Sequence, residues 1–259
     1  MQRIYWKIPM PGTKNKHLSA KVIASSVAGQ LHISQNMPCQ DCYNYALGKN
    51  LIAIVSDGAG SAKYGKTGAR TVCETLCDLL KNADFSKIED EIVRAIKIVR
   101  QKLTYHRYNK TKDDLGLAPF AATIVGVAYK DKKGIFFHIG DGAALSLHTD
   151  NTFTASRPEN GSFSCETFFF TQQAWRENLR FTKFSNAQSI FLMSDGLTSF
   201  AFRPDFSDIE SKFITPINDF LKAEKSLSKA KKALTNTLNT PKAHKLNPDD
   251  KTLVWIKVE

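Results

Sequence analysis

Residues 51–58 read Leu-Ile-Ala-Ile-Val-Ser-Asp-Gly, and residues 189–196 repeat the design as Ser-Ile-Phe-Leu-Met-Ser-Asp-Gly. Each apolar run is too short for an ordinary globular helix and predicts a buried strand that ends at an aspartate. A carboxylate in that place is costly unless a cation or a hydrogen-bond donor meets it. The glycine that follows lets the backbone approach a ligand without a side chain in the way.

Further acidic positions adjoin other apolar runs. Asp41 follows Gln40, Asp141 lies between two glycines, and Asp249 and Asp250 precede the last apolar run. A single Asp-Gly pair usually forms a turn. Several carboxylates from distant strand ends instead favour a centre for Mg²⁺ or Mn²⁺, because hard cations prefer oxygen ligands. Two ions about 3.5–4 Å apart would bind one hydroxide and both faces of a phosphate.

The hydrophobic periodicity predicts an α+β fold with antiparallel sheets, because strands and helices alternate in blocks joined by hairpins. We expect helices over 69–80 and 86–108, and one long helix from 217 to 238 that Pro241 ends. Residues 149–186 lack long periodicity, and we interpret them as a mobile excursion. The expected strands are 21–29, 43–47, 51–56, 121–129, 134–139, 143–148, 189–194 and 252–258.

Composition limits the class of protein. A chain of 259 residues with 42% hydrophobic residues builds one large domain or two small ones, and it has no apolar run long enough to cross a membrane. Residues 1–16 lack the apolar core of a secretory signal. Five cysteines, an odd number, favour a reducing cytoplasm over a disulfide framework.

The net charge of +11 allows an anionic or phosphate-bearing partner. Seven lysines lie between residues 221 and 245, against the single acid Glu224. No aromatic residue interleaves with these lysines, as binding of a single strand would require, so we interpret them as a solvated helix face. Nucleic acid is therefore not the partner that we expect.

Taken together, these motifs resemble the metal-dependent serine/threonine protein phosphatases of type 2C (the PPM family), in their compact bacterial branch. They occur in the family order from residue 24 to 258, and the ordered set is far more specific than any one motif. The matching segments are Gly29-x-x-His32, Pro38-Cys-Gln-Asp41, Val55-Ser-Asp-Gly-Ala-Gly-Ser61, 65–69, Ala122-Thr123, His138-Ile-Gly-Asp-Gly142, Ser194-Asp-Gly-Leu197 and Asp249-Asp-Lys-Thr252.

The resemblance implies a single phosphatase domain over residues 1–259, with an N-terminal extension over 1–20 and a flap-like excursion over 149–186. The family fold is an α-β-β-α sandwich of two antiparallel sheets flanked by helices, with the metals at one end. The implied activity is hydrolysis of phosphoserine and phosphothreonine in proteins by a metal-bridging water, without a phosphoenzyme. The implied partners are a phosphorylated protein and a Ser/Thr kinase that shares its targets, and we expect a monomer.

Metal roles follow from the resemblance residue by residue. Asp57 matches the carboxylate that bridges two divalent cations, Mn²⁺ or Mg²⁺, and Gly58 matches a backbone-carbonyl ligand of the second. Asp195 and Asp249 match the other ligands of the first.

Two other acids have weaker implied roles. Asp41 matches a catalytic acid that acts on the second metal largely through water. Asp141 matches a ligand of a weaker third metal, shared with Asp195.

Two departures affect the phosphate contact and the proton donor. Larger members place an arginine shortly before the first acid, but here His32 is nearest; a histidine common after the Asp-Gly is replaced by Ala59. We hypothesise that His32 takes one of these roles, since the pKa of an unperturbed imidazole lies near neutrality. A structural histidine is the competing interpretation. Lys63 and Arg70 are alternative phosphate contacts that solvation would equally explain.

Other interpretations stay open at this point. The alternatives are a metal-dependent nuclease or phosphodiesterase, and a phosphatase-like binding module without activity. The C-x-x-C of Cys39 and Cys42, with Cys73 and Cys77, also resembles a zinc or redox motif, although core packing explains Cys73. In the excursion, we expect substrate contacts from its charged residues Arg157, Glu166 and Arg176.

Overall fold

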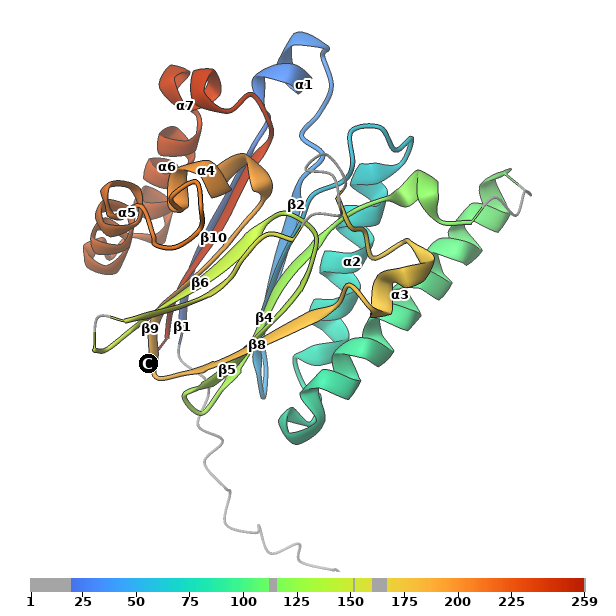
Figure 1. The fold of residues 1–259 in the computed structure, drawn as a ribbon, viewed down its shortest axis with the longest axis horizontal. Helices are drawn as coiled ribbons and strands as arrows, with labels where there is room; N and C mark the ends of the chain where they lie inside the picture. The colour runs from blue at the N-terminus through green and yellow to red at the C-terminus, as the bar shows by residue number, and fades with distance from the viewer. Residues whose placement is uncertain (1–19, 112–115, 151, 160–166, 259) are drawn as a thin grey trace, which may run out of the picture.

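The computed structural model describes residues 20–111, 116–150, 152–159 and 167–258. Two five-stranded antiparallel sheets pack face to face, in the strand orders β1-β10-β9-β6-β7 and β2-β3-β4-β5-β8. Helices α2 and α3 cover the outer face of the second sheet, and α4 to α7 cover that of the first (Figure 1). This arrangement confirms the predicted α-β-β-α sandwich. The expected extension over 1–20 lies almost entirely outside the described residues.

The first sheet consists of β1 (Ala20–Val27), β10 (Lys251–Val258), β9 (Ala187–Met193), β6 (Ala143–His148) and β7 (Phe153–Ser156). The second consists of β2 (Cys42–Leu47), β3 (Leu51–Ser56), β4 (Ile124–Lys130), β5 (Lys133–Ile139) and β8 (Arg180–Ser185). The helices are α1 (Gln30–Ser34), α2 (Gly65–Leu80), α3 (Ile88–Thr111), α4 (Thr198–Ala201), α5 (Ser211–Ala223), α6 (Leu227–Leu238) and α7 (Pro241–Leu246). Short 3₁₀ turns are η1 (Phe85–Lys87), η2 (Ala118–Phe120), η3 (Gln173–Arg176) and η4 (Asp195–Leu197).

The central strands are predominantly apolar because both of their faces are buried. In β3, Leu51 and Val55 pack between the two sheets, whereas Ile52 and Ile54 pack against α2 and α3. The same division holds in β9, where Leu192 lies between the sheets and its neighbours face the other helices. The two Ser-Asp-Gly segments therefore end rigid strands, and their aspartates have well-defined positions.

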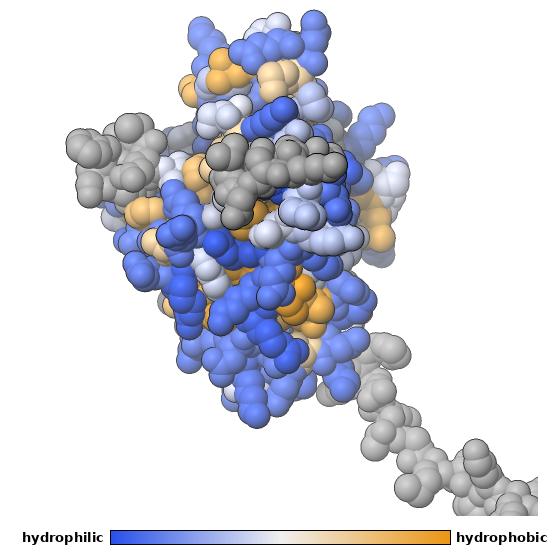
Figure 2. Space-filling model, turned by 90° about the vertical axis from the view of Figure 1, so that its right-hand side faces the viewer, coloured by the Kyte–Doolittle hydropathy of each residue, from blue (hydrophilic) through white to orange (hydrophobic). Residues whose placement is uncertain are grey.

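Helix α3 has the amphipathic pattern that its sequence predicts. Ile92, Ile96, Val99 and Leu103 are buried against the second sheet. The opposite face is predominantly hydrophilic (Figure 2). No helix in the described part of the chain is long and apolar enough to cross a membrane.

The single long helix expected from 217 to 238 is wrong. The structure has two helices, because the chain is extended at Glu224 and Ser226, and the Ser226 hydroxyl accepts a 3.3 Å hydrogen bond from the Lys229 N–H at the start of α6. Side-chain capping of this kind starts a new helix. Pro241 also does more than end a helix: it is the first residue of α7, where a missing N–H costs nothing.

The described part of the segment 149–186 contains secondary structure that we did not expect. It contributes the edge strands β7 and β8, one to each sheet. Between them, Phe170 and Trp175 are buried against the α3 side of the second sheet. Edge strands are short and carry polar residues, which explains the weak periodicity that hid them.

Candidate metal centre

Antiparallel pairing brings the predicted acids to one end of the sandwich, the end that carries α1 (top of Figure 1). Asp41 directly precedes β2 and Asp57 directly follows β3. The adjacent residues Cys42 and Ser56 pair with each other across the two strands, so the two acids lie at the same end of the sheet. On the other sheet, Asp195 follows β9 and Asp249 precedes β10, its antiparallel partner. Asp141 lies in the turn from β5 to β6, where the chain passes between the two sheets.

Two of these acids each have one buried carboxylate oxygen that has no hydrogen-bond partner among the described residues. In Asp41, Oδ2 accepts a 2.7 Å hydrogen bond from the Ser194 hydroxyl, whereas Oδ1 is buried and unpaired among the described residues. In Asp141, Oδ2 accepts a 2.6 Å bond from the Thr167 hydroxyl and Oδ1 is again buried and unpaired there. Buried polar atoms nearly always have a partner. Unpaired carboxylate oxygens therefore fit the ligand set of a hard divalent cation.

Burial and mutual repulsion disfavour the ionised form of these acids. Burial raises the pKa of Asp41 to about 6. The pKa of Asp57 is raised well above its usual value by burial and then by the charges of Asp41 and Asp195. That of Asp195 is raised well above its usual value by burial and by Asp141 and Asp41. Binding of protons or of cations relieves this repulsion, so divalent cations would favour the ionised form of the cluster at neutral pH.

The carboxylates are close enough to repel one another but do not enclose one point. Among residues 20–111, 116–150, 152–159 and 167–258, no three His, Cys, Asp or Glu side chains are grouped to hold an ion by themselves. Mg²⁺ in proteins usually keeps several waters and takes only one or two carboxylates. The residues present therefore fit a divalent centre in which water completes the ligand sets.

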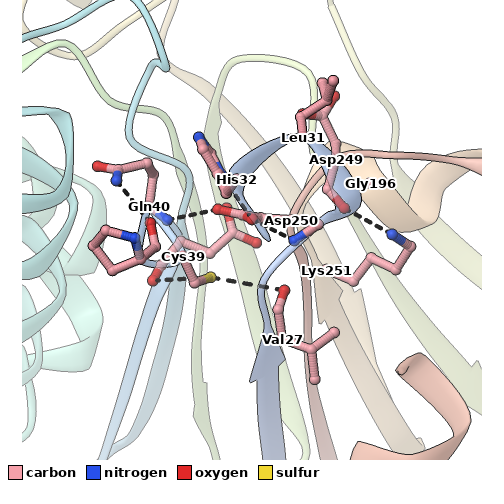
Figure 3. Close-up of polar contacts among 12 residues, drawn as sticks. Val27, Leu31, His32, Cys39, Gln40, Gly196, Asp249, Asp250 and Lys251 are labelled. Carbon is pink, nitrogen blue, oxygen red and sulfur yellow. Dashed lines mark hydrogen bonds and ion pairs between the residues drawn. The ribbon is translucent and has the colours of Figure 1, made fainter. Parts of the chain in front are cut away.

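The two adjacent acids before β10 have different roles. The described residues donate no hydrogen bond to the Asp249 side chain, whose pKa is raised by burial and by the charge of Asp250. Asp250 accepts three hydrogen bonds, which lower its pKa although burial opposes this. Lys251 is fully buried and donates a 2.7 Å bond from Nζ to the Asp249 carbonyl (Figure 3). Asp249 is therefore the acid of this pair with oxygens available to a cation.

His32 and Asp57 line the same small cavity, of about 210 Å³, together with Gly58 and Asp249. Nδ1 of His32 lies 2.8 Å from Asp250 Oδ1. Of the predicted phosphate contacts, only His32 lies on this cavity.

Lys63 and Arg70 lie elsewhere. Lys63 is exposed, with Nζ 5.4 Å from the centroid of the Tyr64 ring. Arg70 lines a second cavity of about 460 Å³, which also contains Asp41, Cys39 and Cys42. Their roles as phosphate contacts stay predictions.

Sequence reasoning missed the hydroxyls and the lysine that hold the strand ends. The Ser56 hydroxyl donates a 2.6 Å bond to the Thr123 carbonyl, and the Ser194 hydroxyl receives the Thr252 N–H at 3.0 Å. Lys66 donates from Nζ to the Cys39 carbonyl at 2.5 Å and so fixes the segment before Asp41. The serine that precedes Asp-Gly in both repeated segments was the signal that would have identified the two hydroxyls.

Gly58 lies where no side chain fits. A Cβ at this position would come within 2.4 Å of the Gly65 carbonyl carbon at the start of α2, whereas a Cβ at Gly60 would find its nearest neighbour, His32 Nε2, at 4.0 Å. We expect Gly58→Ala to lower the free energy of unfolding by about 1–3 kcal/mol, because helix backbone cannot move aside cheaply. Gly60→Ala is the matched control and should change it by less than about 0.5 kcal/mol. Urea unfolding measures both, and equal effects would contradict this explanation.

A model of the protein phosphatase 2C family matches residues 28–239. The chain belongs to the protein phosphatase 2C family. The serine/threonine-protein phosphatase 3 of Escherichia coli is 26% identical to it over 249 residues, which cover 91% of this chain and 97% of that protein. This chain is therefore a serine/threonine protein phosphatase. The comparisons give no support to the nuclease alternative.

Solved structures show the same fold at low sequence identity. The serine/threonine phosphatase of S. agalactiae superposes with a TM-score of 0.66 at 18% identity, over 93% of this chain and all of that one (100%). PppA of Pseudomonas aeruginosa superposes with a TM-score of 0.65 at 15% identity, over 94% and 100% of the two chains. The type 2C fold thus extends over nearly the whole chain.

The cysteines of this phosphatase do not form a zinc site in the described residues. Cys39, Cys42, Cys73 and Cys77 are free thiols. Burial is the largest cause that raises the pKa of each of these thiols, which disfavours the thiolate that zinc or redox chemistry needs. Cys73 and Cys77 lie in the core between α2 and the second sheet, as helical spacing predicts.

Of the three charged residues expected to contact substrate, the structure describes Arg157 and Arg176, which lie on different segments. Glu166 is outside the described residues. Arg157 is exposed after β7, and its carbonyl accepts a 2.8 Å bond from Arg180. Arg176 ends η3, whose Trp175 packs against Arg100 of α3. A substrate role for these residues stays a prediction.

Proposed function

We propose that this phosphatase hydrolyses phosphoserine and phosphothreonine esters of proteins at the carboxylate cluster, with two divalent cations, Mn²⁺ or Mg²⁺, and a weaker third near Asp141 and Asp195. The observation that carries the proposal is the pair of buried, unpaired carboxylate oxygens on Asp41 and Asp141. Their position at the strand ends of a type 2C fold supports it.

When bound, the cations would lower the pKa of a water molecule and compensate the charge of the phosphate. The chain's own residues hold the geometry. Asp57 is fixed by its backbone, since its N–H donates to the Thr123 hydroxyl at 3.0 Å and its carbonyl accepts the Thr123 N–H at 2.9 Å. Asp41 is fixed by Ser194 from the opposite sheet. The two sheets therefore fix the relative positions of the acids, and hydrolysis needs no nucleophilic side chain.

We assign the contact with the phosphate group to His32. It comes from α1, its side chain is 14% exposed, and it shares the cavity with Asp57 and Asp249. A histidine that carries hydrogen on both ring nitrogens can donate to a carboxylate and to a phosphate at once.

Replacing His32 with alanine is expected to raise KM for a small aryl phosphate about tenfold, because a hydrogen bond to the charged phosphate group is lost. The turnover number should change less, since the acids remain in place. Initial rates at saturating Mn²⁺ measure both constants. His244→Ala on α7 is the matched control and should behave as wild type; unchanged KM and rate in His32→Ala would favour the structural interpretation of His32.

The function itself is tested with phosphothreonine and phosphoserine peptides, assayed with Mn²⁺, with Mg²⁺ and with a chelator. We expect release of phosphate that depends on the metal and is lost with the chelator. A single-stranded and a double-stranded nucleic acid in parallel reactions test the nuclease alternative. Cleavage of either one, without release of phosphate from the peptides, would overturn the proposal.

We further propose that the enzyme acts as a monomer in the reducing cytoplasm and opposes a Ser/Thr kinase on shared targets. The free thiols of the four described cysteines support the reducing compartment. Sedimentation at micromolar concentration tests the monomer.

A further inference from the structure

Asp250 is a buried carboxylate outside the proposed ligand set. It is 4% exposed. Its Oδ1 accepts the Gly29 N–H at 2.7 Å and lies 2.8 Å from Nδ1 of His32, and its Oδ2 accepts the Gln40 N–H at 2.5 Å. Figure 3 shows the His32 ring and the Gln40 backbone meeting this one carboxylate. Both oxygens are therefore committed to N–H donors.

These bonds tie the segment 29–40, which contains α1, to the start of β10. The Leu31 N–H adds a 3.2 Å bond to the Pro248 carbonyl. Gly29 allows the approach, because a Cβ there would lie 2.2 Å from the Pro248 oxygen. The segment thus has a fixed position over the end of the first sheet, and the position of His32 depends on Asp250.

The same contact determines which ring nitrogen of His32 faces the cavity. Oδ1 and Oδ2 of Asp250 each accept a backbone N–H, so this carboxylate acts as an acceptor and Nδ1 of His32 donates its hydrogen to it. Nε2 is then the nitrogen that remains for another partner. It lies beside the loop after β3, since a Cβ at Gly60 would be 4.0 Å from it, and that loop borders the cavity with Asp57.

We propose that Asp250 is a positioning residue, which holds His32 with Nδ1–H bound to its carboxylate and Nε2 directed into the cavity toward the phosphate group of the substrate. This inference rests on the proposed function. Carboxylate–histidine pairs orient an imidazole and fix its tautomer in the same way at other sites. Asp250 also lines this cavity. Because both of its oxygens already accept N–H donors, we assign it no contact with substrate or metal and expect it to act through His32 and the segment that carries it.

The test uses Asp250→Asn in the full-length protein, which keeps the shape of the side chain but removes its charge and one acceptor. Asp205→Asn is the matched control, because Asp205 is exposed and, among the described residues, accepts only from Ser207 two positions later in the chain. The first readout is ¹⁵N NMR of labelled histidines in the metal-free protein, which reports the hydrogen on each ring nitrogen. We expect Nδ1 of His32 to be protonated in wild type and control, and to lose that state in Asp250→Asn.

The second readout is steady-state hydrolysis of an aryl phosphate with Mg²⁺. Asp250→Asn should raise KM about tenfold with a smaller change in turnover number, and the double variant with His32→Ala should be no worse than His32→Ala alone. Additive effects, or an Nδ1 signal unchanged in Asp250→Asn, would overturn the proposal. If Asp250→Asn does not fold, His32→Gln is the second variant, because it leaves Asp250 intact. An unchanged KM in His32→Gln would also overturn the proposal. Wild type without any phosphatase activity refutes the proposed function, whereas the NMR readout still tests the Asp250–His32 pair.

Discussion

Asp57→Asn is expected to lower the turnover number for an aryl phosphate by about a thousandfold, equivalent to about 4 kcal/mol of transition-state stabilisation. The side chain is buried, and the charges of Asp41 and Asp195 act on it directly, so a cation between these acids would depend on its charge. An amide of the same shape keeps the packing and loses that charge. Initial rates at saturating Mn²⁺ measure the loss.

Unfolding would not explain such a loss. In the metal-free state, Asp57→Asn should be at least as stable as wild type at pH 8, because it removes one of several buried, mutually repelling carboxylates. Asp150→Asn is the matched control, since Asp150 is exposed and bonds only to Thr152. A variant that keeps a tenth or more of wild-type turnover would exclude Asp57 as a bridging ligand.

The second large effect is on stability as a function of pH without metal. The folded-state pKa of Asp41 is raised from 3.8 to about 6, so the folded protein holds this proton more tightly than the unfolded chain does. The free energy of unfolding therefore falls as pH rises from 3.8 through about 6. For Asp41 alone, this loss is on the order of 3 kcal/mol.

Urea unfolding in chelator at pH 4.5 and 7.5 measures this loss, with Asp41→Asn as the comparison. The comparison is needed because a second buried group also changes stability with pH. His138 is fully buried, which lowers its pKa, so its contribution to the free energy of unfolding rises with pH up to about 6.5 and opposes the loss from Asp41. We expect wild type to lose more stability than Asp41→Asn over this interval, and Mn²⁺ to restore wild type at pH 7.5. Equal losses in the two proteins would show that the raised pKa of Asp41 does not cause the loss of stability.

The sequence predicted the acids more reliably than their surroundings. The Ser-Asp-Gly segments predicted that Asp57 and Asp195 follow buried strands, because an apolar run that ends in this motif is a strong local signal. Their role as metal ligands stays a prediction. The division between α5 and α6 was missed because the cap at Ser226 interrupts a continuous helical periodicity. The edge strands β7 and β8 were missed because short polar strands have almost no hydrophobic periodicity.

The adjacent acids before β10 show the limit of sequence reasoning within the site. From the residues alone, Asp249 and Asp250 are chemically identical. Only the folded chain brings the Gly29 and Gln40 N–H groups and the His32 ring to Asp250 and leaves the oxygens of Asp249 without donors among the described residues. The motif resemblance assigned a ligand role to Asp249, but it gave no role to Asp250, whose partner Gly29 lies 221 positions away in the chain.

The amino-acid sequence by itself determined which strands are buried on both faces, where each ends in a carboxylate, and which family the order of these motifs resembles. These properties depend on residues a few positions apart, and periodicity records them. The tertiary structure alone decided which acids keep free oxygens, which histidine faces them, and which lysine and hydroxyls hold the strand ends. Those outcomes depend on antiparallel register and on contacts between residues up to 221 positions apart in the chain, such as Gly29 and Asp250.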